Sequence, residues 1–208
     1  MRIKNSSVTR LRDANIYPKV KSVLTKYNKN NSFVVGVSGG PDSLALSALA
    51  NTIAEDKKYK FFFAMVDHGI RKNSAKEALQ VKRLLYKHGI NLEILRNRKK
   101  IKNNIQRKAR DVRYQLLEGF CKKKKAKSLI VAHHQDDQIE TFLIRLSRGS
   151  GVEGLSSMQE MTILKSGISL IRPLLEFKKV QLTSIAKKAF GKIFKDPSNK
   201  NKKFLFSK

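Results

Sequence analysis

The chain has 208 residues, which is enough for one domain of ordinary size with a hydrophobic core. Lysine and arginine total 45 against 16 aspartates and glutamates, so the formal net charge is +29 and polyanions such as nucleic acids are attracted. Plentiful Lys, Asn, Ile and Phe are also what an A/T-rich genome produces, so the charge has a mutational explanation beside the functional one. The single cysteine, Cys121, excludes an internal disulfide and a multi-cysteine metal site within this chain.

No apolar run in the sequence is long enough to cross a bilayer, and residues 1–20 contain no continuous apolar stretch of the kind that secretory signals carry. We therefore expect no membrane association. We expect a cytoplasmic location, or the equivalent compartment of an organelle with its own bacterial-type genetic system. Serine, threonine and basic residues near the start leave an organellar transit peptide open.

Residues 1–30 are basic, and we predict a helical N-terminal extension there. After it, short apolar runs alternate with segments of helical periodicity, which predicts strands over 33–37, 61–66, 92–95 and 128–132 and helices over 43–54, 75–88, 104–120, 136–146 and 178–190. Strands that are apolar on both faces are typical of a parallel sheet covered by helices. The predicted fold class is α/β, a doubly wound, mostly parallel, Rossmann-like sheet with helices on both faces over residues 31–195, followed by a basic tail over 196–208.

The first predicted strand leads into the sequence SGGPDS at residues 38–43. Its two glycines permit positive φ and close approach of a ligand, and its proline suits the first position of a helix. Free amides at an electropositive helix start, together with two serine hydroxyls, suit a phosphate group. Asp42 would repel that phosphate unless Mg²⁺ lies between them, so Asp42 is the candidate magnesium ligand. The candidate phosphate-binding residues are Ser38, Gly39, Gly40, Pro41, Asp42 and Ser43.

A second polar cluster follows the fourth predicted strand and contains His133, His134, Asp136, Asp137 and Glu140. It is predicted to meet the same edge of the sheet as the glycine-rich loop, because parallel strands end at one edge. The three carboxylates are spaced by three and four residues, so they share one face of a helix. Acidic residues are also ordinary chemistry for a helix start. In a chain this short of acids, we interpret the cluster as a site for a cation or an amine.

Six segments carry a family resemblance: SGGPDS (38–43), VDHGIR (66–71), ARDVRY (109–114), AHHQDDQIETFLIRLSRGSGVEGLSSM (132–158), IRPLL (171–175) and DPSN (196–199). In this order they resemble the tRNA(Ile)-lysidine synthetase family of PP-loop (N-type) ATP pyrophosphatases. The resemblance covers about Phe33 to Phe204, and its long central segment is the most diagnostic. It implies the same doubly wound fold and a ligase that uses ATP and Mg²⁺.

The reaction implied by the resemblance has two steps. ATP adenylates the wobble cytidine of an isoleucine tRNA with a CAU anticodon, and the amine of free L-lysine then displaces AMP. In that scheme residues 38–43 would hold the ATP phosphates, with Asp42 near Mg²⁺ and with Asp67 and His68 beside the nucleotide. For Asp67 and His68, an ordinary turn at a strand end is the alternative.

The resemblance implies roles for charged residues as well. Arg113 would neutralise phosphate charge, while Asp137 and Glu140 would orient the lysine amine and help it to lose a proton. The implied catalytic residues are thus Asp42, Arg113, Asp137 and Glu140. The other implied substrate-binding residues are Arg110, His133, His134, Arg148, Gly149, Ser150 and Gly151.

The chain departs from the family pattern near its end. Phe206 and Ser207 stand where Arg and Asn are expected, and the chain stops at Lys208, before the C-terminal tRNA-recognition domains of most relatives. A minimal enzyme, a truncated or decayed product and a fragment all stay open, and so does a homodimer. The alternative functions are a non-catalytic basic RNA-binding relative and a tRNA thiolase of the same superfamily. A single cysteine weighs against the thiolase, because such enzymes use paired cysteines.

Overall fold

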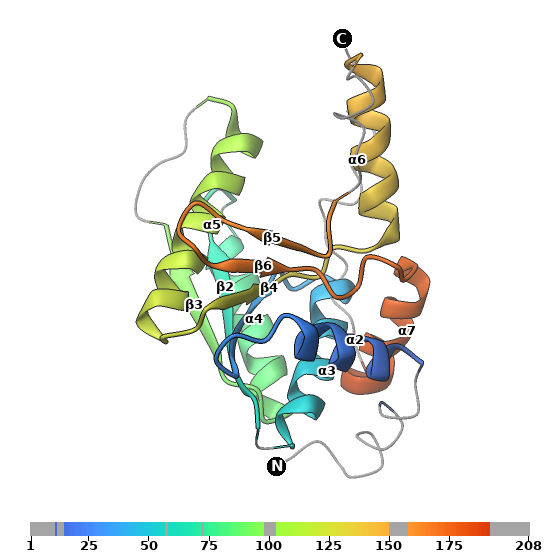
Figure 1. Cartoon of the computed structure of the whole chain (residues 1–208). Coiled ribbons are helices and arrows are strands. Elements are labelled where there is room, and N and C mark those ends of the chain that lie inside the picture. Colours follow the sequence, from blue (N-terminus) through green and yellow to red (C-terminus); the bar gives the residue numbers. More distant parts are fainter. Residues whose placement is uncertain are drawn as a thin grey trace.

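The computed structural model describes residue 11 and residues 15–56, 58–71, 73–97, 103–149 and 158–191. Six strands in this part form one sheet in the order β3-β2-β1-β4-β6-β5 (Figure 1). Their bounds are β1 Ser32–Val37, β2 Lys60–Asp67, β3 Leu92–Arg96, β4 Ser128–Ile130, β5 Met161–Ile163 and β6 Ser169–Ile171. All neighbouring pairs are parallel except β5 with β6.

The order of the strands reverses at β1. The chain first adds β2 and β3 on one side of β1 and then returns to add β4 on the other side. The loops that follow β1 and β4 therefore leave the same edge of the sheet side by side, which is the position where open α/β sheets bind ligands.

Helices cover both faces of the sheet, as a doubly wound fold requires. Their bounds are α2 Ile16–Lys26, α3 Pro41–Ala54, α4 Ser74–Lys87, α5 Ile105–Lys123, α6 Gln135–Ser147 and α7 Lys179–Phe190. Alternate residues of β1 point to opposite faces, so Val35 packs with α2, α3, α4 and α7, whereas Val34 packs with α5. Helix α6 covers neither face and projects away from the body of the molecule (Figure 1).

The predicted α/β class is confirmed, and the five predicted helices after residue 31 begin and end within three residues of the observed ones. The short strands β5 and β6 were not predicted. Each has three residues, too few for a hydrophobic period to be recognised. The buried Arg172 holds this edge of the sheet, because it donates from Nη1 to the Gln159 carbonyl at 2.8 Å and to Thr162 Oγ1 at 3.0 Å.

Helix α2 lies within the predicted N-terminal extension, yet it contributes to the main core. Val20 and Leu24 are 0% and 1% exposed and belong to the same buried cluster as α3 and α7. The domain boundary at residue 30 stays a prediction. Among the described helices, none is both long and apolar enough to cross a membrane.

The burial of α2 leads to a stability prediction. Replacing Leu24 with Ala should lower the free energy of unfolding by about 2–5 kcal/mol, because it leaves a cavity in the core. Ser22 is exposed on the same helix, so Ser22→Ala should change stability by less than about 0.5 kcal/mol. Urea unfolding of both variants measures the difference, and equal small effects would mean that α2 is not part of the cooperative core.

Candidate active site

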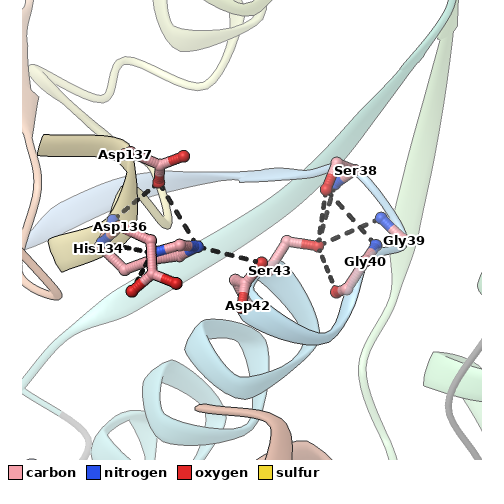
Figure 2. A network of polar contacts seen from close by, with 8 residues as sticks. All are labelled: Ser38, Gly39, Gly40, Asp42, Ser43, His134, Asp136 and Asp137. Atoms are coloured by element: carbon pink, nitrogen blue, oxygen red, sulfur yellow. Dashed lines mark hydrogen bonds and ion pairs between the residues drawn. The ribbon is translucent and has the colours of Figure 1, made fainter. Parts of the chain in front are cut away.

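The loop between β1 and α3 is closed by its own hydrogen bonds (Figure 2). The amides of Ser38 and Gly39 both donate to Ser43 Oγ at 3.1 Å, and that hydroxyl donates to the Gly40 carbonyl at 3.0 Å. Ser43 is 3% exposed, so its buried hydroxyl holds the loop together through these hydrogen bonds. The first amides of α3 have no acceptor four residues earlier in the helix, which makes them the available donors for an anion.

Gly39 is the position in this loop that needs glycine. Its φ is +88°, and a Cβ placed there would lie 2.9 Å from Val81 Cγ2 of α4. The neighbouring Gly40 has φ −72°, and a Cβ there would meet nothing closer than Ser38 Oγ at 3.6 Å. The positive φ and the tight packing on α4 thus explain the first glycine of the motif.

His134 connects this loop to α6. Its Nε2 lies 3.5 Å from Asp42 Oδ2 and 3.6 Å from Asp137 Oδ2, and the residue is 4% exposed (Figure 2). His134 is also the N-cap of α6, because its Nδ1 accepts from the Asp136 amide at 3.2 Å and its own amide donates to Asp137 Oδ2 at 2.9 Å. One imidazole therefore joins a carboxylate at the start of α3 to a carboxylate at the start of α6.

The carboxylates around this imidazole act on its pKa. Burial lowers the pKa of His134, but the hydrogen bond to Asp42 and the charges of Asp137 and Asp136 outweigh burial and raise the pKa above its ordinary value. Because Nδ1 accepts from the Asp136 amide, Nε2 carries the ring proton, and this N–H faces Asp42 and Asp137 and offsets part of the repulsion between them. This balance allows two carboxylates to share a small space.

The opposite side of the site is basic. Burial and then the charges of the nearby Arg172, Arg110 and Arg113 together lower the pKa of His133 to about 4. The pKa of His68 is lowered by burial and then by Arg113, with Asp67 opposing. His133 Nδ1 and both ring nitrogens of His68 are buried without a hydrogen-bond partner in the described part of the chain. Neutral imidazoles beside arginines form a site that favours an anion.

Both sides line one cavity of about 840 Å³. That volume lies within the range of small-molecule sites. The predicted residues that line it are Ser38, Gly39, Gly40, Pro41, Asp42, Ser43, Asp67, His68, Arg113, His133, His134 and Asp137. Arg71 and Lys179, which sequence reasoning did not single out, add cations to the wall. Lys179 is the first residue of α7, and its sequence context resembles any other basic helix start, so no local signal distinguishes it.

Several predicted residues do not line the cavity. Glu140 is exposed one turn further along α6. Arg110 packs over Tyr114, with its guanidinium carbon 5.3 Å from the centroid of that ring. Arg148 and Gly149 lie at the far end of α6. Ser150, Gly151, Phe206 and Ser207 lie outside the described residues. Asp67 is buried and accepts from the Gly69 amide at 3.0 Å, so it supports its own turn as well as the cavity wall.

Asp42 fits the predicted magnesium contact. Its Oδ1 is buried and has no hydrogen-bond partner among the described residues, which leaves a hard oxygen free for a cation. The described residues hold no group of three or more His, Cys, Asp or Glu side chains that could bind a metal alone. Mg²⁺ needs no such group, because it commonly combines one or two carboxylates with substrate phosphates and water.

Comparison with known proteins defines the family. The family model of the PP-loop domain matches residues 13–206, which is nearly the whole chain. The chain belongs to the PP-loop domain family. This family uses ATP.

Several curated relatives of this PP-loop domain are named tRNA(Ile)-lysidine synthase. It is 44% identical over 178 residues to a tRNA(Ile)-lysidine synthase of Wolbachia pipientis, covering 84% of this chain and 41% of that protein. It is 39% identical over 191 residues to a tRNA(Ile)-lysidine synthase of Bradyrhizobium diazoefficiens, covering 89% of this chain and 52% of that protein. The chain therefore spans about half the length of the curated relatives it matches.

Solved structures confirm the fold of the PP-loop domain. The U34-tRNA thiolase NcsA from Methanococcus maripaludis matches with a TM-score of 0.71 at 21% identity, over 88% of this chain and 64% of that chain. An NH3-dependent NAD synthetase from Campylobacter jejuni matches with a TM-score of 0.51 at 15% identity, over 86% of this chain and 72% of that chain. At these identities the likeness concerns the fold alone.

The strain at Gly39 leads to a prediction with a matched control. Gly39→Ala should lower the free energy of unfolding by about 1–3 kcal/mol, because alanine at positive φ is strained and its Cβ clashes with Val81. Gly40→Ala should cost much less, because its backbone is extended and the space is open. Chemical denaturation of the two variants tests this difference, and equal losses would contradict the assigned loop geometry.

The depressed pKa of His133 leads to a prediction about pH. Its folded pKa of about 4 lies below the unfolded value of about 6.5, so between these pH values the unfolded chain binds a proton that the folded chain does not. Stability should therefore fall as the pH falls through this window, by up to about 3 kcal/mol from this group. His133→Asn should flatten that part of the stability profile measured by urea unfolding between pH 7 and 4. An unchanged profile would mean that His133 is not buried as a neutral group.

Proposed function

We propose that this chain is the ATP-using catalytic part of a tRNA(Ile)-lysidine synthase. In this reaction the wobble cytidine of a CAU-anticodon isoleucine tRNA is adenylated and then joined to L-lysine. The observation that carries the proposal is the bridge from Asp42 through His134 to Asp137, which puts an anion-binding loop and a carboxylate pair on one cavity. Such a cavity suits a reaction in which an amine displaces AMP from an adenylated base.

The ATP side of the proposal rests on the loop over residues 38–43. The free amides at the start of α3 bind the β- and γ-phosphates, because they are donors at an electropositive helix end. Arg113 and Lys179 line the same cavity and reduce the charge of the bound triphosphate. Neutral His133 and His68 offer ring nitrogens to the phosphate or to the base without adding a full charge.

Mg²⁺ is the proposed cofactor beside ATP. Asp42 holds it through its free Oδ1, while Oδ2 stays with His134. When bound, the ion neutralises charge on the leaving pyrophosphate. His134 keeps the Asp42 carboxylate oriented, since its ring is buried and fixed by the N-cap of α6.

The amine side of the proposal rests on the first turns of α6. Attack by lysine requires the neutral amine, so a carboxylate must hold the ammonium and accept its proton. Asp137 lines the cavity and is fixed by His134, and Glu140 lies one turn further on the same helix. The amine then forms the bond to C2 of the cytidine, and the bond from C2 to the adenylated oxygen breaks to release AMP.

The proposed partner is tRNA, which the basic surface attracts. Lys122 and Lys127 are exposed at the end of α5 and in the turn before β4, so they are available for phosphate contacts. Such contacts position RNA without reading its sequence. The proposed location is the cytoplasm or an equivalent organellar compartment, because this tRNA is found there. The proposal also includes a homodimer, which a measurement of the oligomeric state in solution would test.

A thiolase is the second candidate because the thiolase structure shares the fold. Cys121 does not support it. The residue is fully buried, and burial followed by the charge of Glu118 raises the pKa of its thiol to about 12, so it is not a nucleophile. A non-catalytic RNA-binding relative has no reason to keep Asp42, His134 and Asp137 joined in one cavity.

A direct assay tests the proposed function. The chain is incubated with labelled L-lysine, ATP, Mg²⁺ and a CAU-anticodon isoleucine tRNA transcript. Incorporation of lysine into tRNA with release of AMP and pyrophosphate supports the proposal, and omission of ATP or a CAU-to-GAU change in the anticodon should abolish it. Tight RNA binding without incorporation would indicate the non-catalytic relative instead.

Two aspartates on α6 offer a matched pair of variants. Asp137→Asn should reduce lysine incorporation by about 10²–10⁴-fold, because the amine loses its carboxylate while the amide oxygen still accepts from the His134 amide. Asp136 is exposed, so Asp136→Asn should retain activity within about threefold. Tight binding of ATP, measured by calorimetry, should survive in both, and similar losses of incorporation would contradict the role of Asp137.

The role of the basic surface is tested through salt dependence. The double variant Lys122→Ala/Lys127→Ala should weaken tRNA binding and lower the slope of log K against log salt by about one for each phosphate that is no longer neutralised. ATP binding should not change, because neither lysine lines the cavity. Filter binding between low and physiological salt measures the slope, and an unchanged slope would exclude these lysines from the RNA-binding surface.

A further inference from the structure

Helix α4 carries a stripe of basic and apolar side chains on its outer side, formed by Lys76, Leu79, Arg83 and Tyr86. Tyr86 is 69% exposed and Leu79 is 43% exposed, and both cations of the stripe are exposed as well. Spacings of three, four and three residues put the four side chains on one side of the helix. This α4 stripe lies opposite the residues that α4 buries against the sheet.

The cations on the outer side of α4 have no acidic partner within the described part of the chain. Lys76, Lys82 and Arg83 form no ion pair there, whereas three lysines of α2 each pair with a carboxylate. The single acidic residue of α4 is Glu77, which is occupied by Arg71 at 2.9 Å. Unpaired positive charge gathered on one outer face favours a polyanion as partner.

The α4 stripe begins next to the cavity of the candidate active site. Glu77 and Gln80 line that cavity, and they directly follow Lys76 and Leu79 of the stripe. From Lys76 to Tyr86 the stripe runs about 15 Å along the helix, because each residue rises about 1.5 Å. A strand of stacked nucleotides rises about 3.4 Å per nucleotide, so about four nucleotides cover this length.

The combination of side chains indicates which polyanion fits. Proteins bind single-stranded nucleic acid with aromatic rings set among cations, because the ring stacks on a base while the cations neutralise phosphates. In a paired RNA helix the bases are stacked on one another, so no base face is available to the ring of Tyr86. A second copy of the chain fits poorly, since a symmetric contact through this face would bring the same unpaired cations together.

We propose that the α4 stripe binds unpaired RNA nucleotides next to the base that enters the cavity. Tyr86 stacks on one of these bases, while Lys76 and Arg83 neutralise neighbouring phosphates. The identity of this RNA rests on the proposed function, because the target base of that reaction lies in an anticodon loop, whose nucleotides are unpaired. The α4 stripe thus distinguishes a single strand from a duplex, which phosphate contacts alone do not.

RNA binding by the full chain, measured without ATP and lysine, tests the stacking. Two RNAs are compared, a hairpin with the CAU anticodon loop and a fully paired duplex with the same number of nucleotides. Tyr86→Ser should weaken hairpin binding by about tenfold or more and leave duplex binding within about twofold. Tyr86→Phe keeps the ring and should bind the hairpin as the parent does. Equal hairpin affinity in the parent and Tyr86→Ser, or equal losses on the two RNAs, would overturn the proposal.

A loss of folding is separated from a loss of stacking by urea unfolding. Because Tyr86 is exposed, both of its variants should unfold at the same urea concentration as the parent.

The charges of the stripe are tested with a matched pair of double variants. Lys76→Gln/Arg83→Gln removes two cations from the stripe, and Lys187→Gln/Lys188→Gln removes two exposed cations from the last turn of α7. The first variant should lower the slope of log K against log salt for the hairpin by about 0.7 for each phosphate that is no longer neutralised, and the second should leave it unchanged. Equal effects would mean that only the total charge matters, which would overturn the proposal.

The outcomes also separate this surface from the proposed function. Hairpin binding that depends on Tyr86, in a chain that incorporates no lysine, would refute the proposed function and keep the surface. Lysine incorporation together with hairpin binding that Tyr86→Ser leaves unchanged would refute the surface alone.

Discussion

The parallel pairing of β1 with β4 is the constraint on which the whole site depends. The two strands pair at three positions, which are Phe33 with Ser128, Val34 with Leu129 and Val35 with Ile130. This pairing brings together loops that lie more than 80 residues apart in the chain. Because both strands end at the same edge, Asp42 and Asp137 come within reach of a single imidazole, that of His134. If this register slipped by one residue, the core-facing side chains would change faces and the bridge would be lost.

The cavity next to that bridge is divided by charge. Asp42 and Asp137 make one side acidic, and His134 between them limits their repulsion. On the other side, burial and arginines keep His133 neutral, so its ring nitrogen can meet an anion without first giving up a proton. A chain with a formal net charge of +29 thus contains a small acidic pocket beside a basic wall. An acidic pocket next to a basic wall suits substrates that carry both an anionic and a cationic group.

The acidic side depends on the least supported helix of the described chain. Asp137 and Glu140 lie on α6, whose base is fixed by His134 and Gln138 and whose outer turns have no buried residue. A contact with the exposed apolar side chains of α6, which are Ile139, Phe142, Leu143 and Leu146, will therefore affect the position of Glu140 more than that of Asp137. This links the stability of a surface helix to the geometry of the site, since Glu140 lies beyond the fixed base, among the exposed apolar residues of the outer turns.

Local sequence was sufficient for the parallel α/β class, for most of the strands and helices, and for the glycine-rich loop as a phosphate-binding candidate. These features depend on hydrophobic period and on turn chemistry within a few neighbouring residues, so they can be read without knowing the fold. The short strands β5 and β6 carry too few residues for such a period, and they form because the parallel edge at β4 provides a partner.

Only the tertiary structure decided how the predicted site residues divide among different tasks. Ser43, predicted to meet phosphate, also holds its own loop together, and His134, predicted to meet substrate, also joins Asp42 to Asp137. Lys179 lines the cavity although nothing in its local sequence indicates this, whereas Arg148 lies at the distant end of α6. The physical reason is that these outcomes depend on distances between segments remote in the chain, and such distances are set by sheet register and helix direction.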